Sequence, residues 1–150
     1  MANTDHDINV LNTLIKTILD SRKGFLDAAE DAKSTEFAAF FADFAGRREQ
    51  AAAILQNEVR RLGGSAEDEA SFLGAAHRTF LNIKQLFVDR DDKAIINEVE
   101  RGEDYIKEKF DIALSDGKVS SSTRSVIENA YISVREGHDR ASAMKHSMMQ

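Results

Sequence analysis

Residues 95–110, which read IINEVERGEDYIKEKF, decide how this chain folds. Their apolar side chains recur at steps of three and four residues, a spacing that predicts a helix with one buried stripe. The stripe consists of Ile95, Ile96, Val99, Ile106 and Phe110. Between Val99 and Ile106 it should continue, but Gly102 and Glu103 stand there. Because a buried acid is costly unless another group pairs with it, the sequence predicts a partner for Glu103 in the core.

The composition favours an all-helical protein. The 150 residues include no proline and only eight glycines, and Ala, Glu, Lys and Leu are common. The length is that of one domain, which we expect to span residues 1–150. The chain has no cysteine, which excludes a disulfide framework, a zinc–thiolate site and a thiol nucleophile.

Charge and hydropathy narrow the expected partners. The net charge of −6 disfavours non-specific binding to nucleic acid, because such binding depends on neutralising phosphates. No window approaches eighteen uninterrupted apolar residues, and the first residues lack the pattern of a signal peptide. We therefore expect a cytoplasmic protein that binds neither nucleic acid nor membranes.

Helical periodicity also marks four other segments, separated by turn and capping residues. The five predicted helices run from about residue 5 to 33, 35 to 62, 65 to 87, 91 to 115 and 120 to 143, with a tail after 143 that loses the period. Gly63 and Gly64 predict a helix end, since glycine accepts the left-handed conformation of a C-cap. On the first helix, Asp20 falls on the polar side and is expected to be exposed.

Four of these helices are long and of similar length, which predicts a four-helix bundle with short turns. The third, at residues 65–87, is shorter and would carry the chain back along the bundle. The predicted fold is therefore an all-α four-helix bundle with an additional connecting helix.

Each of the four long stripes loses its apolar character at one position: Arg22, Arg48, Glu103 and His138. One interpretation is a structural polar belt, in which arginines bind the carboxylate of Glu103 and His138 forms a hydrogen bond nearby. The planar guanidinium group suits this role because it stays charged when it is buried.

The other interpretation is a metal site. Carboxylates and histidines that project into a four-helix bundle hold iron in di-iron proteins, and Glu49, Glu100, Glu103 and His138 are the candidate ligands for iron or manganese. The ligand set is incomplete, because the sequence lacks the two Glu-x-x-His pairs of a di-metal centre. Two arginines at the same level would also repel cations.

The second helix carries Phe37, Phe40, Phe41 and Phe44 at helical spacing. This cluster predicts core packing first, and second a surface for a homodimer or a protein partner. The sequence has no recognisable nucleophile–base pair and no glycine-rich phosphate loop, which disfavours hydrolytic and phosphoryl-transfer chemistry.

Several segments resemble a bacterial family of ferritin-like four-helix bundles classed as a domain of unknown function. They are LNTLIKTILDSRKGFLDAAEDA (11–32), EVRRLGG (58–64), AAHRTFLNIK (75–84), ERGEDY (100–105) and VREGHDR (134–140). The resemblance implies a ferritin-like bundle in a bacterial cytoplasm. It also suggests metal handling or stress protection, as in ferritins, rubrerythrins and the DNA-protecting mini-ferritins.

These observations lead to three functional expectations. The leading one is a non-catalytic, stress-associated protein with a structural Arg/Glu/His belt. The alternative is a degenerate or mononuclear iron- or manganese-binding oxidase or storage protein that uses Glu49, Glu100, Glu103 and His138. The third is a helical scaffold for a protein partner.

Overall fold

The structure is a computed structural model, described here for residues 3–31, 35–68 and 92–148. Within these residues the chain forms four helices and no strand, which confirms the all-α prediction. They are α1 (Asn3–Asp31), α2 (Thr35–Arg61), α5 (Asp92–Ser115) and α6 (Ser121–Met148). Of the predicted connecting helix, residues 65–68 are not helical, and the part after residue 68 lies outside the described residues.

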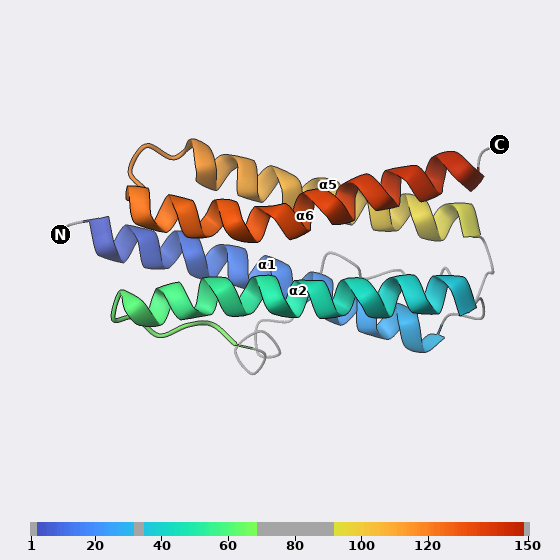
Figure 1. Cartoon of the computed structure of the whole chain (residues 1–150), viewed down its shortest axis with the longest axis horizontal. Coiled ribbons are helices and arrows are strands. Elements are labelled where there is room, and N and C mark those ends of the chain that lie inside the picture. Colours follow the sequence, from blue (N-terminus) through green and yellow to red (C-terminus); the bar gives the residue numbers. More distant parts are fainter. Residues whose placement is uncertain (1–2, 32–34, 69–91, 149–150) are drawn as a thin grey trace.

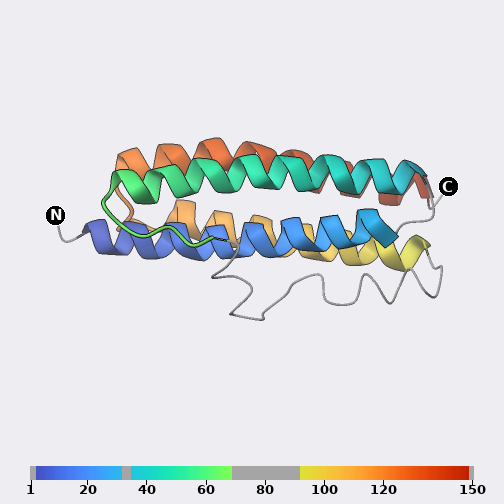
Figure 2. The same ribbon diagram turned by 90° about the horizontal axis from the view of Figure 1, so that it is seen from below.

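The helices form two antiparallel hairpins, α1–α2 and α5–α6, that pack against each other (Figure 1). Helix α2 contacts α6, and α1 contacts α5, so the four helices enclose a common core. The view in Figure 2 shows α2 and α6 as one layer and α1 and α5 as the other. Because α2 ends and α5 begins at opposite ends of the bundle, the topology includes a crossover between them.

The end of α2 is a Schellman motif, as the paired glycines predict. Gly63 has a φ of +86°. Its N–H donates to the carbonyl of Arg60, and the N–H of Gly64 donates to the carbonyl of Val59. The predicted C-cap is therefore confirmed.

The core combines aliphatic side chains from all four helices with a cluster of aromatic rings. In this cluster the ring of Phe25 on α1 lies 6.0 Å from Phe41 and 5.9 Å from Phe44, both on α2. Phe37 is also buried, whereas Phe40 is half-buried. The prediction that the phenylalanines of α2 are core residues is thus confirmed.

Two expectations about the helices were wrong. Asp20 is only 5% exposed. The buried arc of α1 is wider than a single stripe, because α1 packs against both α2 and α5. The tail was expected to leave the helix after residue 143, but α6 continues to Met148, and Met144 packs against the core.

None of the helices in the described part of the chain combines the length and the apolar character that a membrane span requires.

Candidate functional site

The centre of the bundle holds a buried ion pair between Arg48 of α2 and Glu103 of α5. Both side chains are 0% exposed, and Nη2 of Arg48 donates a hydrogen bond to Oε2 of Glu103. Glu103 lies on the buried stripe of α5, with Val99 and Ile106 fully buried on either side. The guanidinium group therefore neutralises the acid at the point where the stripe is interrupted.

Three other residues shape the space around this pair. The guanidinium carbon of Arg48 lies 5.9 Å from the ring centroid of Phe25. Gly137 of α6 is buried beside the pair, and a Cβ atom there would lie 2.5 Å from Nη2 of Arg48 and 3.2 Å from the ring of Phe44. Helix α6 thus accommodates the ion pair by having no side chain at this position.

The pair is only partly satisfied by hydrogen bonds. Nε and Nη1 of Arg48 and Oε1 of Glu103 have no partner among the described residues. Burial raises the pKa of Glu103 above its ordinary value, while the charge and the hydrogen bond of Arg48 act in the opposite direction. A pair of this kind contributes little net stability, although loss of either partner alone is costly.

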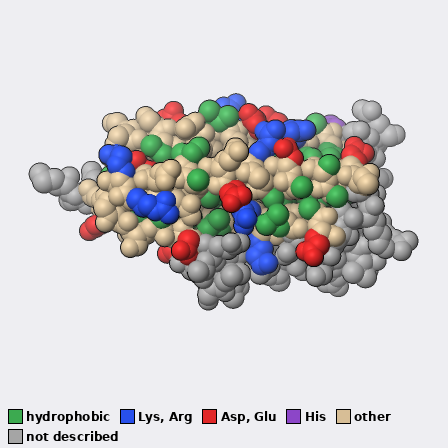
Figure 3. Space-filling view, turned by 60° about the horizontal axis from the view of Figure 1, so that its bottom comes forward, with side chains coloured by type: hydrophobic (Ala, Val, Ile, Leu, Met, Phe, Trp, Pro, Cys, Tyr) green, Lys and Arg blue, Asp and Glu red, His purple; other side chains and the backbone are tan. Residues whose placement is uncertain are grey.

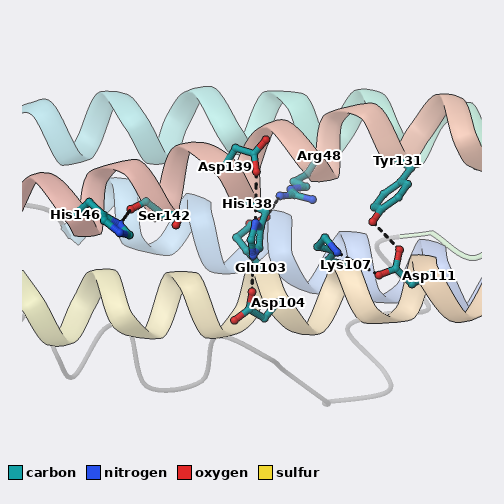
Figure 4. A network of polar contacts seen from close by, with 10 residues as sticks. All are labelled: Arg48, Glu103, Asp104, Lys107, Asp111, Tyr131, His138, Asp139, Ser142 and His146. Carbon is teal, nitrogen blue, oxygen red and sulfur yellow. Dashed lines mark hydrogen bonds and ion pairs between the residues drawn. The ribbon is translucent and has the colours of Figure 1, made fainter.

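His138 of α6 lies beside the pair and points to Asp104 of α5 (Figure 4). Its Nε2 atom is 2.5 Å from Oδ1 of Asp104, the residue after Glu103, and its Nδ1 atom is 3.6 Å from Oδ1 of Asp139. The imidazole is 24% exposed and Asp104 is 59% exposed. Sequence reasoning missed Asp104 because it faces outward on α5, away from the stripe that drew attention to Glu103.

Among the other predicted residues, Arg22 and Glu49 form a second ion pair. Arg22 of α1 pairs with Glu49 of α2, with 3.9 Å between Nε and Oε2, and the Glu49 side chain is 67% exposed. Glu100 is half-buried on α5, one turn before Glu103. Of the residues considered for the belt and the metal site, the structure brings Arg48 and Glu103 into direct contact and pairs Arg22 with Glu49.

The described side chains do not gather around a common point for a metal ion. Among the described residues, no three His, Asp or Glu side chains gather in a way that could hold one ion. One carboxylate oxygen of Glu103 accepts a hydrogen bond from Arg48, and Glu49 is exposed to solvent. A guanidinium group in contact with the central carboxylate also opposes cation binding by charge repulsion.

A second polar cluster lies at the N-terminus of α6, where the sequence predicts a cap from residues 120–123 but not the contacts of that cap with Asp7 and Glu58. Asp7 of α1 accepts hydrogen bonds from the backbone N–H of Ser120 at 3.1 Å and from its hydroxyl at 2.7 Å. The hydroxyl of Ser120 in turn accepts a bond from the N–H of Thr123 at 3.4 Å. Ser120 is therefore the N-cap of α6, and Asp7 anchors this cap to α1.

Glu58 of α2 completes this second cluster. It is 4% exposed and accepts hydrogen bonds from the hydroxyl of Thr123 at 3.0 Å and from Nε and Nη2 of Arg61, both at 2.6 Å. The hydrogen bond from Arg61 is the main cause that lowers the pKa of Glu58; burial opposes it, and the hydrogen bond from Thr123 supports it. Of the contacts that Glu58 makes, only the one with Arg61 could be expected from the sequence, because the two residues are three positions apart on one helix.

A smaller exposed contact joins α5 to α6 further along. The hydroxyl of Tyr131 donates to Asp111 at 2.6 Å, and Nζ of Lys107 lies 3.3 Å from the same carboxylate. The hydrogen bond from Tyr131 is the main cause that lowers the pKa of Asp111. The Tyr131 ring also stacks on Phe110, with 5.6 Å between the centroids. This contact is a structural link between the two helices.

Comparison with protein families finds a match. Residues 6–116, more than half of the chain, match the family described as "Domain of unknown function (DUF2383)". No curated protein matches the chain.

Proposed function

The chain belongs to the family of unknown function DUF2383, and we propose that it is a non-catalytic, cytoplasmic protein with a ferritin-like bundle as its single domain. Its central polar residues are structural, and it acts by associating with itself or with a protein partner. A stress-associated role is part of the proposal, and it rests on the resemblance to a ferritin-like family of residues 11–32, 58–64, 75–84, 100–105 and 134–140.

One observation carries this proposal. The carboxylate that interrupts the core, Glu103, is in contact with Arg48, and both side chains are fully buried. A carboxylate that held a metal would need to turn its oxygens to the ion, and a neighbouring guanidinium group would reduce its affinity. The ion pair instead fixes the register of α2 against α5, a role for which buried charged groups are suited.

Charge argues against a nucleic-acid partner. The net charge is −6, and the face drawn in Figure 3 mixes acidic, basic and hydrophobic side chains. Binding to nucleic acid depends on a concentration of positive charge, which that face does not offer. We therefore propose a protein partner.

A second candidate function is a mononuclear iron or manganese site. The observation in its favour is the contact between His138 and Asp104 at 2.5 Å, which places an imidazole and a carboxylate side by side near the surface. Glu100 and Glu103 on the same helix would have to supply further ligands. This candidate requires Glu103 to exchange its contact with Arg48 for a metal ion.

Metal content and stability together test the two candidates. The protein is purified without chelator or affinity-tag metal, its iron and manganese are measured, and its melting temperature is followed during titration with ferrous iron. The proposed function predicts no metal-dependent change in melting temperature. About one iron or manganese ion per chain, with a stabilisation that disappears in His138→Ala, would establish the metal site instead.

Replacement of the central acid is the complementary measurement. Glu103→Ala should lower the free energy of unfolding by about 3–5 kcal/mol, because it leaves Arg48 buried without an anion. Urea unfolding gives this value directly. An unchanged stability would contradict the structural role of the ion pair.

A further inference from the structure

We propose that the groove between α2 and α6 is the surface through which two copies of this chain associate. This inference deepens the proposed function by naming the partner, and it rests on the association described there. The relevant surface is not the phenylalanine cluster of α2, most of which is buried.

The groove is continuous over several helical turns. It consists of two hollows of about 180 Å³ and about 400 Å³ that share Ile54 of α2 and Asn129 of α6 among their lining residues. Ile132, at the edge of the first hollow, is 56% exposed. Ile54 and Val126 are half-buried along the groove. These side chains form an apolar strip along the groove, and burying this strip against a partner is favourable.

The spacing along α2 suits the packing of another helix. Arg47, Gln50, Ile54, Asn57 and Arg61 line the two hollows and follow one another at steps of three and four residues. That spacing keeps the side chains on one face over about four turns. A helix of a second copy can lie along this face in the manner of a bundle helix.

The charges along the groove fit a second copy of the same chain. Nη1 of Arg47 on α2 lies 2.6 Å from Oε2 of Glu136 on α6. At the next level, Nη1 of Arg140 on α6 lies 3.5 Å from Oδ2 of Asp43 on α2. At these two levels, a charge on α2 is therefore paired with the opposite charge on α6.

A two-fold axis along the groove makes this arrangement self-complementary. Rotation about this axis places α2 of one copy against α6 of the other, with no displacement along the helices. Arg47 of each copy then faces Glu136 of the other, and Asp43 faces Arg140. At the other end Arg61, which lies 3.5 Å from Ser122 within one copy, faces that uncharged serine. Opposite charges thus meet in the dimer, which favours this orientation over others.

The groove between α1 and α5 lacks this pairing of opposite charges on its two helices. It has a volume of about 160 Å³ and also carries an exposed isoleucine, Ile112, which is 58% exposed. Of its charged lining residues, Lys109 lies on α5 and Asp116 directly follows the end of that helix, whereas the lining residues of α1 are uncharged. The two isoleucines are therefore a matched pair, of which only Ile132 lies in the proposed interface.

The test measures the mass of the full chain in solution by sedimentation velocity over a range of concentrations. We expect a dimer whose dissociation constant rises at least about tenfold in Ile132→Glu and stays unchanged in Ile112→Glu. Circular dichroism verifies that both variants remain helical. A wild-type chain that is monomeric at every concentration overturns the proposal. So does a dimer that Ile112→Glu dissociates and Ile132→Glu does not.

A charge exchange tests the orientation of the two copies. Arg47→Glu should weaken the dimer because it opposes Glu136 of the other copy, and Arg47→Glu with Glu136→Arg should restore it. Failure of the double variant to restore association overturns the two-fold arrangement. The readout is mass, whereas the proposed function is tested by metal content and unfolding. The dimer proposal and the proposed function can therefore fail separately.

Discussion

A Cβ atom added to Gly137 of α6 would lie 2.5 Å from Nη2 of Arg48, the atom through which this arginine binds Glu103. The same Cβ would lie 3.0 Å from Oε2 of Glu103. Helix α6 therefore takes part in the central ion pair although its own polar residue at this level, His138, is directed to Asp104. Three helices, rather than two, determine the geometry of the buried charges.

Gly137→Ala should destabilise the protein, even though alanine is the better helix former by about 1 kcal/mol. The added methyl group must displace Arg48 or Glu103 in a packed core, and overpacking of this kind costs about 1–3 kcal/mol. Urea unfolding of the variant measures the effect.

Gly46→Ala is the matched control for this substitution. Gly46 lies within α2, and a Cβ atom there would have no neighbour within 4 Å. This variant should gain up to about 1 kcal/mol from helix propensity alone. If both glycine variants gained stability, Gly137 would not be needed to accommodate the ion pair.

Replacement of both charged residues should cost much less than replacement of one. Arg48→Met or Glu103→Leu alone leaves an uncompensated buried charge and should cost about 3–5 kcal/mol. The double variant lacks both charges and their unsatisfied polar atoms. Its free energy of unfolding should therefore lie between that of the wild type and a value about 1–4 kcal/mol higher. A double-mutant cycle measures the coupling. Additive losses would mean that the two residues do not act as a pair.

The contact between His138 and Asp104 should contribute far less than the central pair. Asp104 is 59% exposed, and exposed ion pairs are worth no more than about 1 kcal/mol. Asp104→Asn should therefore lower the unfolding free energy only slightly, and 1 M salt should reduce the difference further. A loss as large as that of Glu103→Ala would show that His138 is essential to the core.

Glu58 should make the stability fall at acidic pH. Its pKa in the folded protein is lowered from the ordinary value of 4.5, mainly by the hydrogen bond from Arg61. The stabilisation is complete above pH 4.5. It is lost as the pH falls from 4.5 through the lower folded pKa, because the unfolded chain then binds a proton that the folded chain does not.

Unfolding experiments on Glu58→Gln between pH 7 and pH 3 measure this contribution. The wild type should be the more stable protein at pH 7, and the difference should shrink as the pH falls below 4.5. Glu128→Gln, at an exposed position of α6, serves as the control for the loss of one negative charge. A difference that is the same at every pH would assign the stabilising effect of Glu58 to packing instead.

The positions of the helices were largely predictable because they depend on local order in the sequence. Steps of three and four residues mark the buried stripe of α5, and Val99, Ile106 and Phe110 are fully buried. Gly63 marks the end of α2 for an equally local reason, its access to a positive φ. By contrast, the burial of Asp20 depends on how widely neighbouring helices cover α1, which no local pattern records.

The partners within the candidate site were less predictable. Arg22 and Arg48 interrupt their stripes in the same way, so both were candidates to bind Glu103. In the structure Arg48 contacts Glu103, whereas Arg22 pairs with Glu49. The choice depends on the rotation and axial level of each helix, which are set by packing across the bundle.

The sequence by itself determined that the chain is helical, where α2 ends, and that Glu103 stands in an apolar stripe where it needs a partner. These properties follow from the helical period and from the backbone preferences of single residues. Only the tertiary structure decided that this partner is Arg48, that Gly137 leaves room for the pair, and that Asp104 binds His138. Those contacts join residues on different helices, and their distances depend on how the helices pack side by side.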